Sequence, residues 1–380
     1  MNKQRTTNHE SAISSNIEEL LTAKHGPCVS VLMNLFTAGN MLKLNDVNLR
    51  RNIEKAKTSI TTWHGPEEDK ANLLERLDSL ASLFRNQGAY HGLGLFVSAE
   101  VSQLIEFPFP VIECSIVGNS FETRDVLFLE QYLEPYYALN ISKDAMRLYK
   151  GRGQSLTEIT GEAFPKHHTA EYEYEHASPG SSHGYSLKGF EKDKGEIANI
   201  RQETFVKSAA RNLAATIHDP NALLVVAGPA RLVNEVELAY PYTDNMVRID
   251  ASFNGKTFNK FAESVWQQVV DSRKKQVASA VKRVGDLPLN SKAEGLREVW
   301  EAANEGRGLL LLVERDFQRI AYKLTGTNSI RLHPPKERYE VIADGVDDVI
   351  EKVRNKHGRV IYTEPGELSR YDGIVLTLRY

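Results

Sequence analysis

Short apolar runs and apolar stripes at helical spacing divide the first third of the chain into regular elements. Runs of strand length occur at 27–34, 92–97, 101–107 and 111–117. Between the first two runs, residues 42–61 and 66–86 carry apolar side chains every three or four positions, the spacing of amphipathic helices. With a further short helix over 11–26, this order of strands and helices predicts an α/β domain.

A second set of elements follows Glu134-Pro135, where we place a domain boundary. We expect strands at 136–141, 145–149 and 155–159, a helix at 196–217, a buried strand at 222–229 and a helix at 257–283. The turn at 151–154 makes the second and third of these strands a hairpin. Residues 160–195 hold no long apolar run and are rich in Gly, Ser, His, Lys and Glu, which predicts a long loop.

The last part of the chain ends in an amphipathic helix and two apolar runs. We expect a helix at 291–304, strands at 308–313 and 319–324, a loop at 325–340, a helix at 344–358 and strands at 359–363 and 373–380. A free tail would gain nothing from Ile374, Val375 and Leu376, so the final strand is predicted to lie inside a sheet. This order of elements predicts helices on both faces of that sheet, an α/β/α layering.

Length and composition indicate a globular protein with more than one core. The chain has 380 residues, and we predict three domains at 1–132, 133–275 and 276–380. The expected fold class is α/β, with a mixed sheet and the long loop in the middle domain. Hydrophobic residues make up 41% and charged residues 26% of the chain, the proportions of an ordinary soluble protein.

Charge and targeting features narrow the expected environment. The formal net charge is −3, so any contact with RNA would have to come from local basic patches. No apolar run approaches the roughly 20 residues that span a bilayer, and the polar start lacks the apolar core of a signal peptide. We therefore expect no membrane association and a cytoplasmic location, with Cys28 and Cys114 as buried free thiols.

Motifs in all three predicted domains occur in an order that resembles one known family. They are Pro27-Cys-Val-Ser-Val31, Tyr136-Tyr-Ala-Leu-Asn-Ile-Ser-Lys143 followed by Arg147-Leu-Tyr-Lys-Gly151, Leu223-Leu-Val-Val-Ala-Gly-Pro229, Gly366-Glu367-Leu368 and the closing Leu378-Arg379-Tyr380. Together they resemble the bacterial archaeo-eukaryotic release factor family, which is related to pelota and to the class-one release factors. The resemblance extends over residues 25–380.

The resemblance implies both a fold and a cellular role. It implies a last domain in α/β/α layers, as in the C-terminal domains of pelota and the release factors. It also implies a ribosome-associated translation factor that binds the ribosomal A site in rescue or hibernation, without catalysis. A GTPase of the elongation-factor-Tu type is the further partner that it implies, docked on the last domain.

The tripeptide Gly-Gly-Gln, with which true release factors position their transition state, is absent from the sequence. Gly153-Gln154 stands at the tip of the predicted hairpin, where a tight turn is the simpler interpretation. We therefore expect no catalytic residue. Two other functions stay open, namely a peptidyl-tRNA hydrolase that uses residues 178–195 without this tripeptide, and a non-ribosomal RNA or protein adaptor on the same scaffold.

Basic and aromatic residues in and after the long loop form the first candidate site, for RNA. These residues are His183, Tyr185, Lys188, Lys192, Lys194 and Arg201. Cations contact phosphates and aromatic rings stack on exposed bases, so this mixture favours an RNA contact. Glu191, Asp193 and Glu196 offset much of the charge, and a solvated loop is the alternative interpretation.

A second basic segment lies in the last domain, around Pro334-Pro335. Its cations are Arg331, His333, Lys336 and Arg338. We predict that this segment contacts a partner. The alternative is a rigid proline turn whose cations only face water.

Histidines and glutamates between 167 and 176 raise the question of a metal site. They are His167, His168, Glu171, Glu173, Glu175 and His176. The alternation of Glu and Tyr over 171–175 is more simply an edge strand with one acidic face. The sequence also has no nucleophile elbow and no Walker loop. We expect neither a metal site nor a cofactor.

Overall fold

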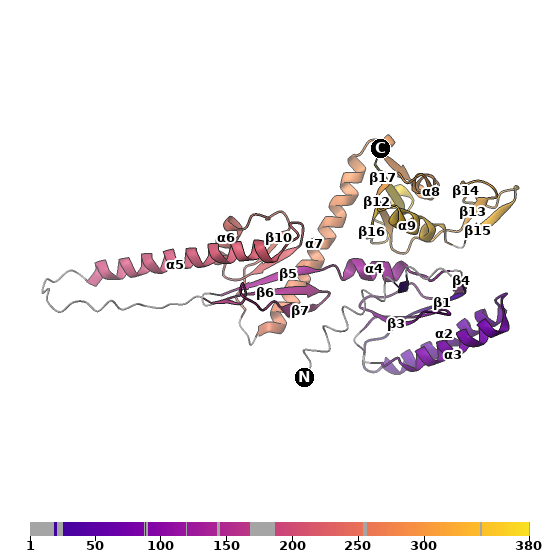
Figure 1. Cartoon of the computed structure of the whole chain (residues 1–380), viewed down its shortest axis with the longest axis horizontal. Coiled ribbons are helices and arrows are strands. Elements are labelled where there is room, and N and C mark those ends of the chain that lie inside the picture. Colours follow the sequence, from indigo (N-terminus) through magenta and orange to yellow (C-terminus); the bar gives the residue numbers. More distant parts are fainter. Residues whose placement is uncertain are drawn as a thin grey trace. The chain divides into compact units, whose positions relative to one another are not determined.

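The computed structural model describes most of the chain (Figure 1). The described residues are 19–20, 26–86, 88, 90–118, 120–142, 145–167, 187–253, 257–342 and 344–379, with the side chains of 187–199 excepted. The chain forms two compact units, one combining Met1–Tyr132 with Ala280–Tyr380 and the other made of Leu133–Ser279. Helices and strands are mixed in both units, which confirms the predicted α/β class. Among the described residues, no helix has the length and apolar character needed to cross a membrane.

The first strands of the chain form an antiparallel sheet of order β3-β2-β1-β4. The strands are β1 (Cys28–Asn34), β2 (Gly92–Val97), β3 (Ser102–Phe107) and β4 (Cys114–Gly118). The helices α2 (Leu42–Thr62) and α3 (Glu67–Ser82) lie together against one face of this sheet (Figure 1). Apolar residues of β1, β2, α2 and α3 form the core of this sheet, with Leu104 of β3 and Val117 of β4 partly buried against it, in agreement with the apolar pattern. The helix predicted over 11–26 falls almost wholly outside the described residues.

The sheet of the second unit is mixed, as predicted, with order β10-β9-β5-β6-β7 and β8 paired to β6. Its strands are β5 (Tyr136–Ile141), β6 (Ala145–Arg152), β7 (Ser155–Glu158), β8 (Lys166–His167), β9 (Leu224–Ala227) and β10 (Met246–Ile249). The pairs β5·β9 and β9·β10 are parallel, whereas β5·β6 and β6·β7 are antiparallel.

Helices cover both faces of this mixed sheet. They are α5 (Leu187–Thr216), α6 (Ala230–Ala239) and α7 (Phe258–Asp286). Leu139 and Ile141 of β5 pack in the same core as α5 and α6, while the alternate residues Tyr136 and Ala138 pack with the part of α7 that belongs to this unit. Successive residues of a strand point to opposite faces, so β5 contributes apolar residues to the cores on both sides of the sheet.

The sequence pattern did not predict α6 and β10, which follow the buried strand β9. The segment holds a helix of 10 residues and a strand of 4 residues. Elements this short show too few periods for a stripe or an alternation to stand out, and the parallel pairing of β10 with β9 stabilises the strand through a distant partner.

The last part of the chain forms a sheet of order β11-β17-β12-β16. Its elements are β11 (Lys292–Glu294), α8 (Gly295–Glu305), β12 (Gly308–Glu314), α9 (Gly345–Asn355), β16 (Arg359–Thr363) and β17 (Ile374–Leu378). Helices α8 and α9 pack on one face, and the end of α7 with the 3₁₀ turn Ser369–Tyr371 packs on the other, so the predicted α/β/α layering is confirmed. Strand β17 pairs with β11 and with β12, so the final strand lies inside the sheet as predicted.

A close contact in the second unit gives a test of its packing. Gly151 lies opposite Tyr136 across β5·β6, and a Cβ at Gly151 would lie 2.2 Å from the Tyr136 ring. We expect Gly151→Ala to lower the free energy of unfolding by about 1–3 kcal/mol, because the buried ring or the strand must move. Urea unfolding measures this change. Gly161→Ala, where a Cβ would meet no atom within 4 Å, is the control and should shift stability by no more than about 0.5 kcal/mol.

Candidate functional site

The described residues of the first candidate site lie on α5. Residues 187–195 were predicted as loop, but α5 begins at Leu187 and not near Glu196, so this part of the prediction is wrong. The segment Leu187–Gly195 holds three lysines but also two glycines, and it lacks the apolar stripe on which the pattern depends. The segment is helical as the continuous start of the long helix that follows it.

The residues of this first site are described only in part. His183 and Tyr185 lie outside the described residues, and Lys188, Lys192 and Lys194 lie on α5 with side chains outside them. Arg201 is exposed on α5. The RNA contact of these six residues stays a prediction.

The exposed Gln154 is explained by a turn. Gly153 adopts φ 53° between β6 and β7, a left-handed conformation that favours glycine, and Gln154 follows at the exposed tip. The hydroxyl of Tyr136 donates a hydrogen bond of 2.9 Å to the carbonyl oxygen of Gly153. The predicted tight turn is thus confirmed.

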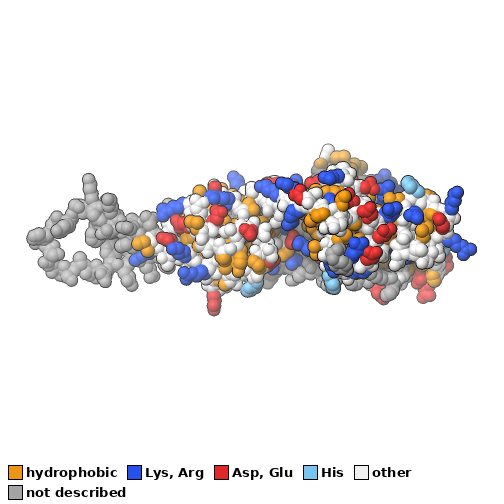
Figure 2. All heavy atoms as spheres, turned by 90° about the horizontal axis from the view of Figure 1, so that it is seen from above, with side chains coloured by type: hydrophobic (Ala, Val, Ile, Leu, Met, Phe, Trp, Pro, Cys, Tyr) orange, Lys and Arg blue, Asp and Glu red, His pale blue; other side chains and the backbone are white. Residues whose placement is uncertain are grey.

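The second candidate site is the basic segment beside three short strands. They are β13 (Ala321–Leu324), β14 (Ile330–Arg331) and β15 (Tyr339–Ile342), in the order β14-β13-β15. The prediction of 325–340 as a continuous loop is therefore wrong, since β14 and the start of β15 fall within it. Arg331 ends β14, and His333, Lys336 and Arg338 follow before or at the approach to β15, all four exposed. Figure 2 shows basic side chains in blue at the right-hand end of the molecule, where Figure 1 places these strands.

Thiols and possible metal ligands give no further site among the described residues. Cys28 and Cys114 are free, and burial raises the pKa of Cys28 to about 11 and that of Cys114 to about 12, which keeps both thiols protonated. In the part of the chain that the structure describes, no group of three His, Cys, Asp or Glu side chains could hold a metal ion. Of the histidines and glutamates between 167 and 176, His167 ends β8 and the others lie outside the described residues.

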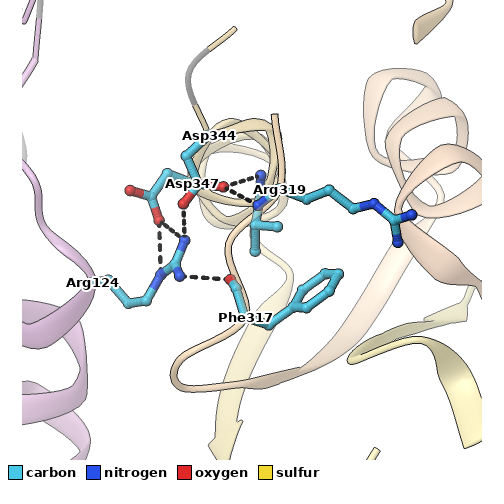
Figure 3. Close-up of polar contacts among 6 residues, drawn as sticks. Arg124, Phe317, Arg319, Asp344 and Asp347 are labelled. Carbon is cyan, nitrogen blue, oxygen red and sulfur yellow. Dashed lines mark hydrogen bonds and ion pairs between the residues drawn. The ribbon is translucent and has the colours of Figure 1, made fainter. Parts of the chain in front are cut away.

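A buried ionic cluster, which the sequence pattern did not predict, lies between α4 (Arg124–Tyr132) and the first turn of α9 (Figure 3). Arg124 is 3% exposed and donates to Asp347 Oδ1 from Nε at 3.0 Å and from Nη2 at 2.7 Å. It also donates to Asp344 Oδ2 and, at 2.6 Å, to the carbonyl oxygen of Phe317. Asp344 in turn accepts from the backbone N–H of Val346 at 2.9 Å, the N-cap bond of α9.

Carboxylates outnumber the guanidinium in this cluster. Burial, and then the negative charge of the neighbouring Asp347, raise the pKa of Glu122 to about 8. Burial also raises the pKa of Asp344, against the opposing effect of Arg124. A perturbed carboxylate can mark a functional site, but here the guanidinium is fully occupied by protein partners, which indicates a structural role.

Further contacts of α4 reinforce the cluster. Arg315 pairs with Asp125 at 2.8 Å, and its guanidinium carbon lies 4.5 Å from the ring centroids of both Phe109 and Phe128. Leu127 belongs to the same buried core as α8 and α9. Helix α4 therefore joins the N-terminal sheet to the last part of the chain within one unit. Its own sequence carries a signal, since Arg124 and Asp125 precede the apolar run 126–129, but this signal does not reveal the partners.

Comparisons with known proteins agree with the motifs. Residues 135–307 match the family model described as bacterial archaeo-eukaryotic release factor family 3. This match confirms the predicted resemblance to the bacterial archaeo-eukaryotic release factor family. No curated protein matches the chain.

Solved structures similar to this chain include several translation factors. Archaeal Pelota, in a model of ribosome-bound Pelota and ABCE1, is 13% identical over 97% of this chain and 94% of that chain, with a TM-score of 0.40. Dom34 from S. cerevisiae, a translation termination-like factor interacting with Hbs1, is 13% identical over 78% and 81%, with a TM-score of 0.42. The archaeal termination factor aRF1 is 12% identical over 98% of each chain, with a TM-score of 0.25.

Because the carboxylates of the cluster are largely buried, we expect loss of the Arg124 cation to lower stability strongly. Arg124→Met leaves Asp344 and Asp347 without their partner, and we expect the free energy of unfolding of this unit to fall by about 3 kcal/mol. Hydrogen exchange of the β12 and β17 amides measures it. The control is Arg354→Met, which breaks the more exposed ion pair between Arg354 of α9 and Glu130 of α4. This substitution should cost at most about 1 kcal/mol. Equal effects of the two substitutions would contradict a structural role for the cluster.

The raised pKa of Glu122 predicts a pH dependence with a defined sign. The folded state holds a proton on Glu122 up to about pH 8, whereas the unfolded chain loses it near pH 4.5, the ordinary pKa of a glutamate. The stability that this proton contributes is therefore complete below the unfolded pKa and is lost as the pH rises through the folded pKa. We expect Glu122→Gln to be nearly neutral at the acidic end of this range and stabilising at its alkaline end, as measured by urea unfolding. A difference in unfolding free energy between wild type and variant that does not change with pH would contradict this pH dependence.

Proposed function

We propose that this protein is a ribosome-associated translation factor of the pelota and release factor type, which occupies the ribosomal A site in rescue or hibernation without catalysis. The observation that carries the proposal is the match of residues 135–307 to a release factor family. Release factors act in the A site, and the motifs that resemble this family extend into the segments before and after the matched residues.

The absence of Gly-Gly-Gln supports occupancy of the site over peptide release. The glutamine that follows a glycine here, Gln154, stands at the tip of a hairpin whose geometry accounts for it. In this proposal the protein therefore acts through a surface that is complementary to the ribosomal A site. A catalytic group is not part of the proposal.

The charge distribution agrees with local contacts to RNA. The net charge of −3 gives no general attraction to nucleic acid. The proposed RNA contacts are made by Lys188, Lys192, Lys194 and Arg201. The basic segment 331–338 is proposed as a second surface. We further propose that a GTPase of the elongation-factor-Tu type docks on the last of three domains, 1–132, 133–275 and 276–380, and that the protein works in the cytoplasm.

Ribosome association can be tested with matched charge variants. We expect the wild-type chain to sediment with 70S ribosomes through sucrose, and the fourfold alanine variant of Lys188, Lys192, Lys194 and Arg201 to lose about tenfold in affinity, because each lost phosphate contact weakens binding. The control removes four other cations, Lys55, Lys274, Lys275 and Lys282, and should sediment like the wild type.

Two outcomes would contradict this function. A chain that never sediments with ribosomes, from growing or from stressed cells, is not a ribosome factor. Release of peptide from peptidyl-tRNA that disappears in Gln154→Ala or His183→Ala would replace the proposal with a hydrolase.

A further inference from the structure

The β14-β13-β15 sheet is anchored through one of its faces. Ala321 and Ile330 on this inner face are buried in the core that α8 and α9 share. The indole N–H of Trp300 donates a hydrogen bond of 2.7 Å to the carbonyl oxygen of Asn328, between β13 and β14. The backbone N–H of Gly345 donates to the carbonyl oxygen of Arg319 at 2.9 Å, just before β13. The sheet is therefore held firmly on the last part of the chain.

The opposite, outer face is apolar and aromatic although it faces solvent. Register places Tyr322 opposite Val341, and Leu324 opposite Tyr339, and residues directly opposite share a face. Tyr339 is 40% exposed and Val341 59%, and Ile320, just before β13, is 51% exposed. The rings of Tyr322 and Tyr339 meet edge to face with centroids 5.2 Å apart. A contiguous exposed surface of this kind usually marks an interaction site.

Exposed cations lie on this outer face and in the segment next to it in the sequence. Arg331 lies opposite Tyr322 in the β13·β14 pair and so belongs to the same face. Lys336 and Arg338 are exposed in the segment that leads into β15, with Glu337 between them. Among the described residues, Arg331, Lys336 and Arg338 make no ion pair, so their charge is available to an anionic partner.

We propose that the outer face of the β14-β13-β15 sheet binds an unpaired segment of RNA. Tyr339 and Tyr322 offer rings for base stacking, and Arg331, Lys336 and Arg338 contact the phosphates. The inference rests on the proposed ribosome association and deepens it by naming a surface and the chemical class that it takes.

The chemistry of the face favours unpaired RNA over the other anionic partners. Duplex RNA is recognised by its shape and its 2′-hydroxyls, and its stacked bases offer no ring face to a flat sheet. Unpaired bases stack on exposed aromatic side chains while cations follow the backbone, and this combination is what the outer face presents. An acidic protein would use the cations but gives the two tyrosines no specific role.

The test uses the full-length protein and labelled oligonucleotides followed by fluorescence anisotropy. The probes are an oligouridine of about 12 nucleotides and an RNA duplex of equal length. We expect tighter binding of the single strand, a loss of about tenfold in Tyr339→Ala, and near wild-type affinity in Tyr339→Phe, which keeps the ring. Circular dichroism establishes that both variants fold.

A salt series tests the cations separately. The triple alanine variant of Arg331, Lys336 and Arg338 should lower the slope of log affinity against log salt by about 2, the contribution of three phosphate contacts to a single strand. The control triple removes the exposed Lys282, Arg283 and Arg297 and should leave the slope unchanged.

Each result decides between the inference and the proposed function. Equal binding of duplex and single strand, equal effects of the two triple variants, or no binding of RNA would overturn the inference, and the last result would leave the face to a protein partner. If the wild-type chain still sediments with ribosomes when one of these results is found, the proposed function stands and only the inference fails. If the wild-type chain does not sediment with ribosomes, the proposed function is contradicted.

Discussion

The burial of Arg124 against Asp344 and Asp347 is the interaction on which the arrangement of the larger unit depends. The partners are separated by 220 and 223 positions in the sequence. Desolvation of such charges offsets much of their attraction, so the cluster contributes less to net stability than its geometry suggests. Its effect is directional, because a guanidinium with hydrogen bonds to two carboxylates and one carbonyl accepts few other orientations. The apolar contacts of Leu127 supply the stabilisation, and Arg124 fixes how α4 is placed.

This contact also joins segments from the two ends of the sequence. One unit consists of the first and last segments, and residues 133–279 are inserted between them. The inserted unit has its own cores on both faces of its sheet and is connected at Tyr132–Leu133 and within α7. Because the larger unit closes over a long insertion, we expect that its α4 contacts form late, after the inserted unit has shortened the effective loop.

The elements that could be predicted from sequence are those whose burial is encoded locally. Strands β2, β5 and β16 coincide with the predicted residues. The apolar run of β2 is buried along its whole length, so it needs no knowledge of its partners to be recognised. Helix α4 was missed because its placement comes from pairs with residues far along the chain. The start of α5 was missed because it lacks an apolar stripe.

The candidate site was harder to predict than the fold, for a related reason. The pattern assumes that apolar residues point inward, but Tyr339 and Val341 are the outward-facing residues of β15. Outward-facing apolar residues reverse the rule that reveals a strand, so the cations next to them were recognised while β14 and the start of β15 were predicted as a loop. The sequence did indicate the basic charge of this segment, because charged residues can be counted without a structure.

The two basic segments of the proposed function, in a chain of net charge −3, suit a partner that presents several anionic sites at once. Each surface has few cations, and a short RNA that reaches only one of them would dissociate readily at physiological salt. A large RNA that reaches both would convert the second contact into an intramolecular one and gain affinity from the effective concentration, without any additional contact. Under the proposed function, the modest charge of the chain therefore favours discrimination between RNA partners by their size and geometry. A uniformly basic protein would lose this discrimination, because any RNA fragment would then compete for it.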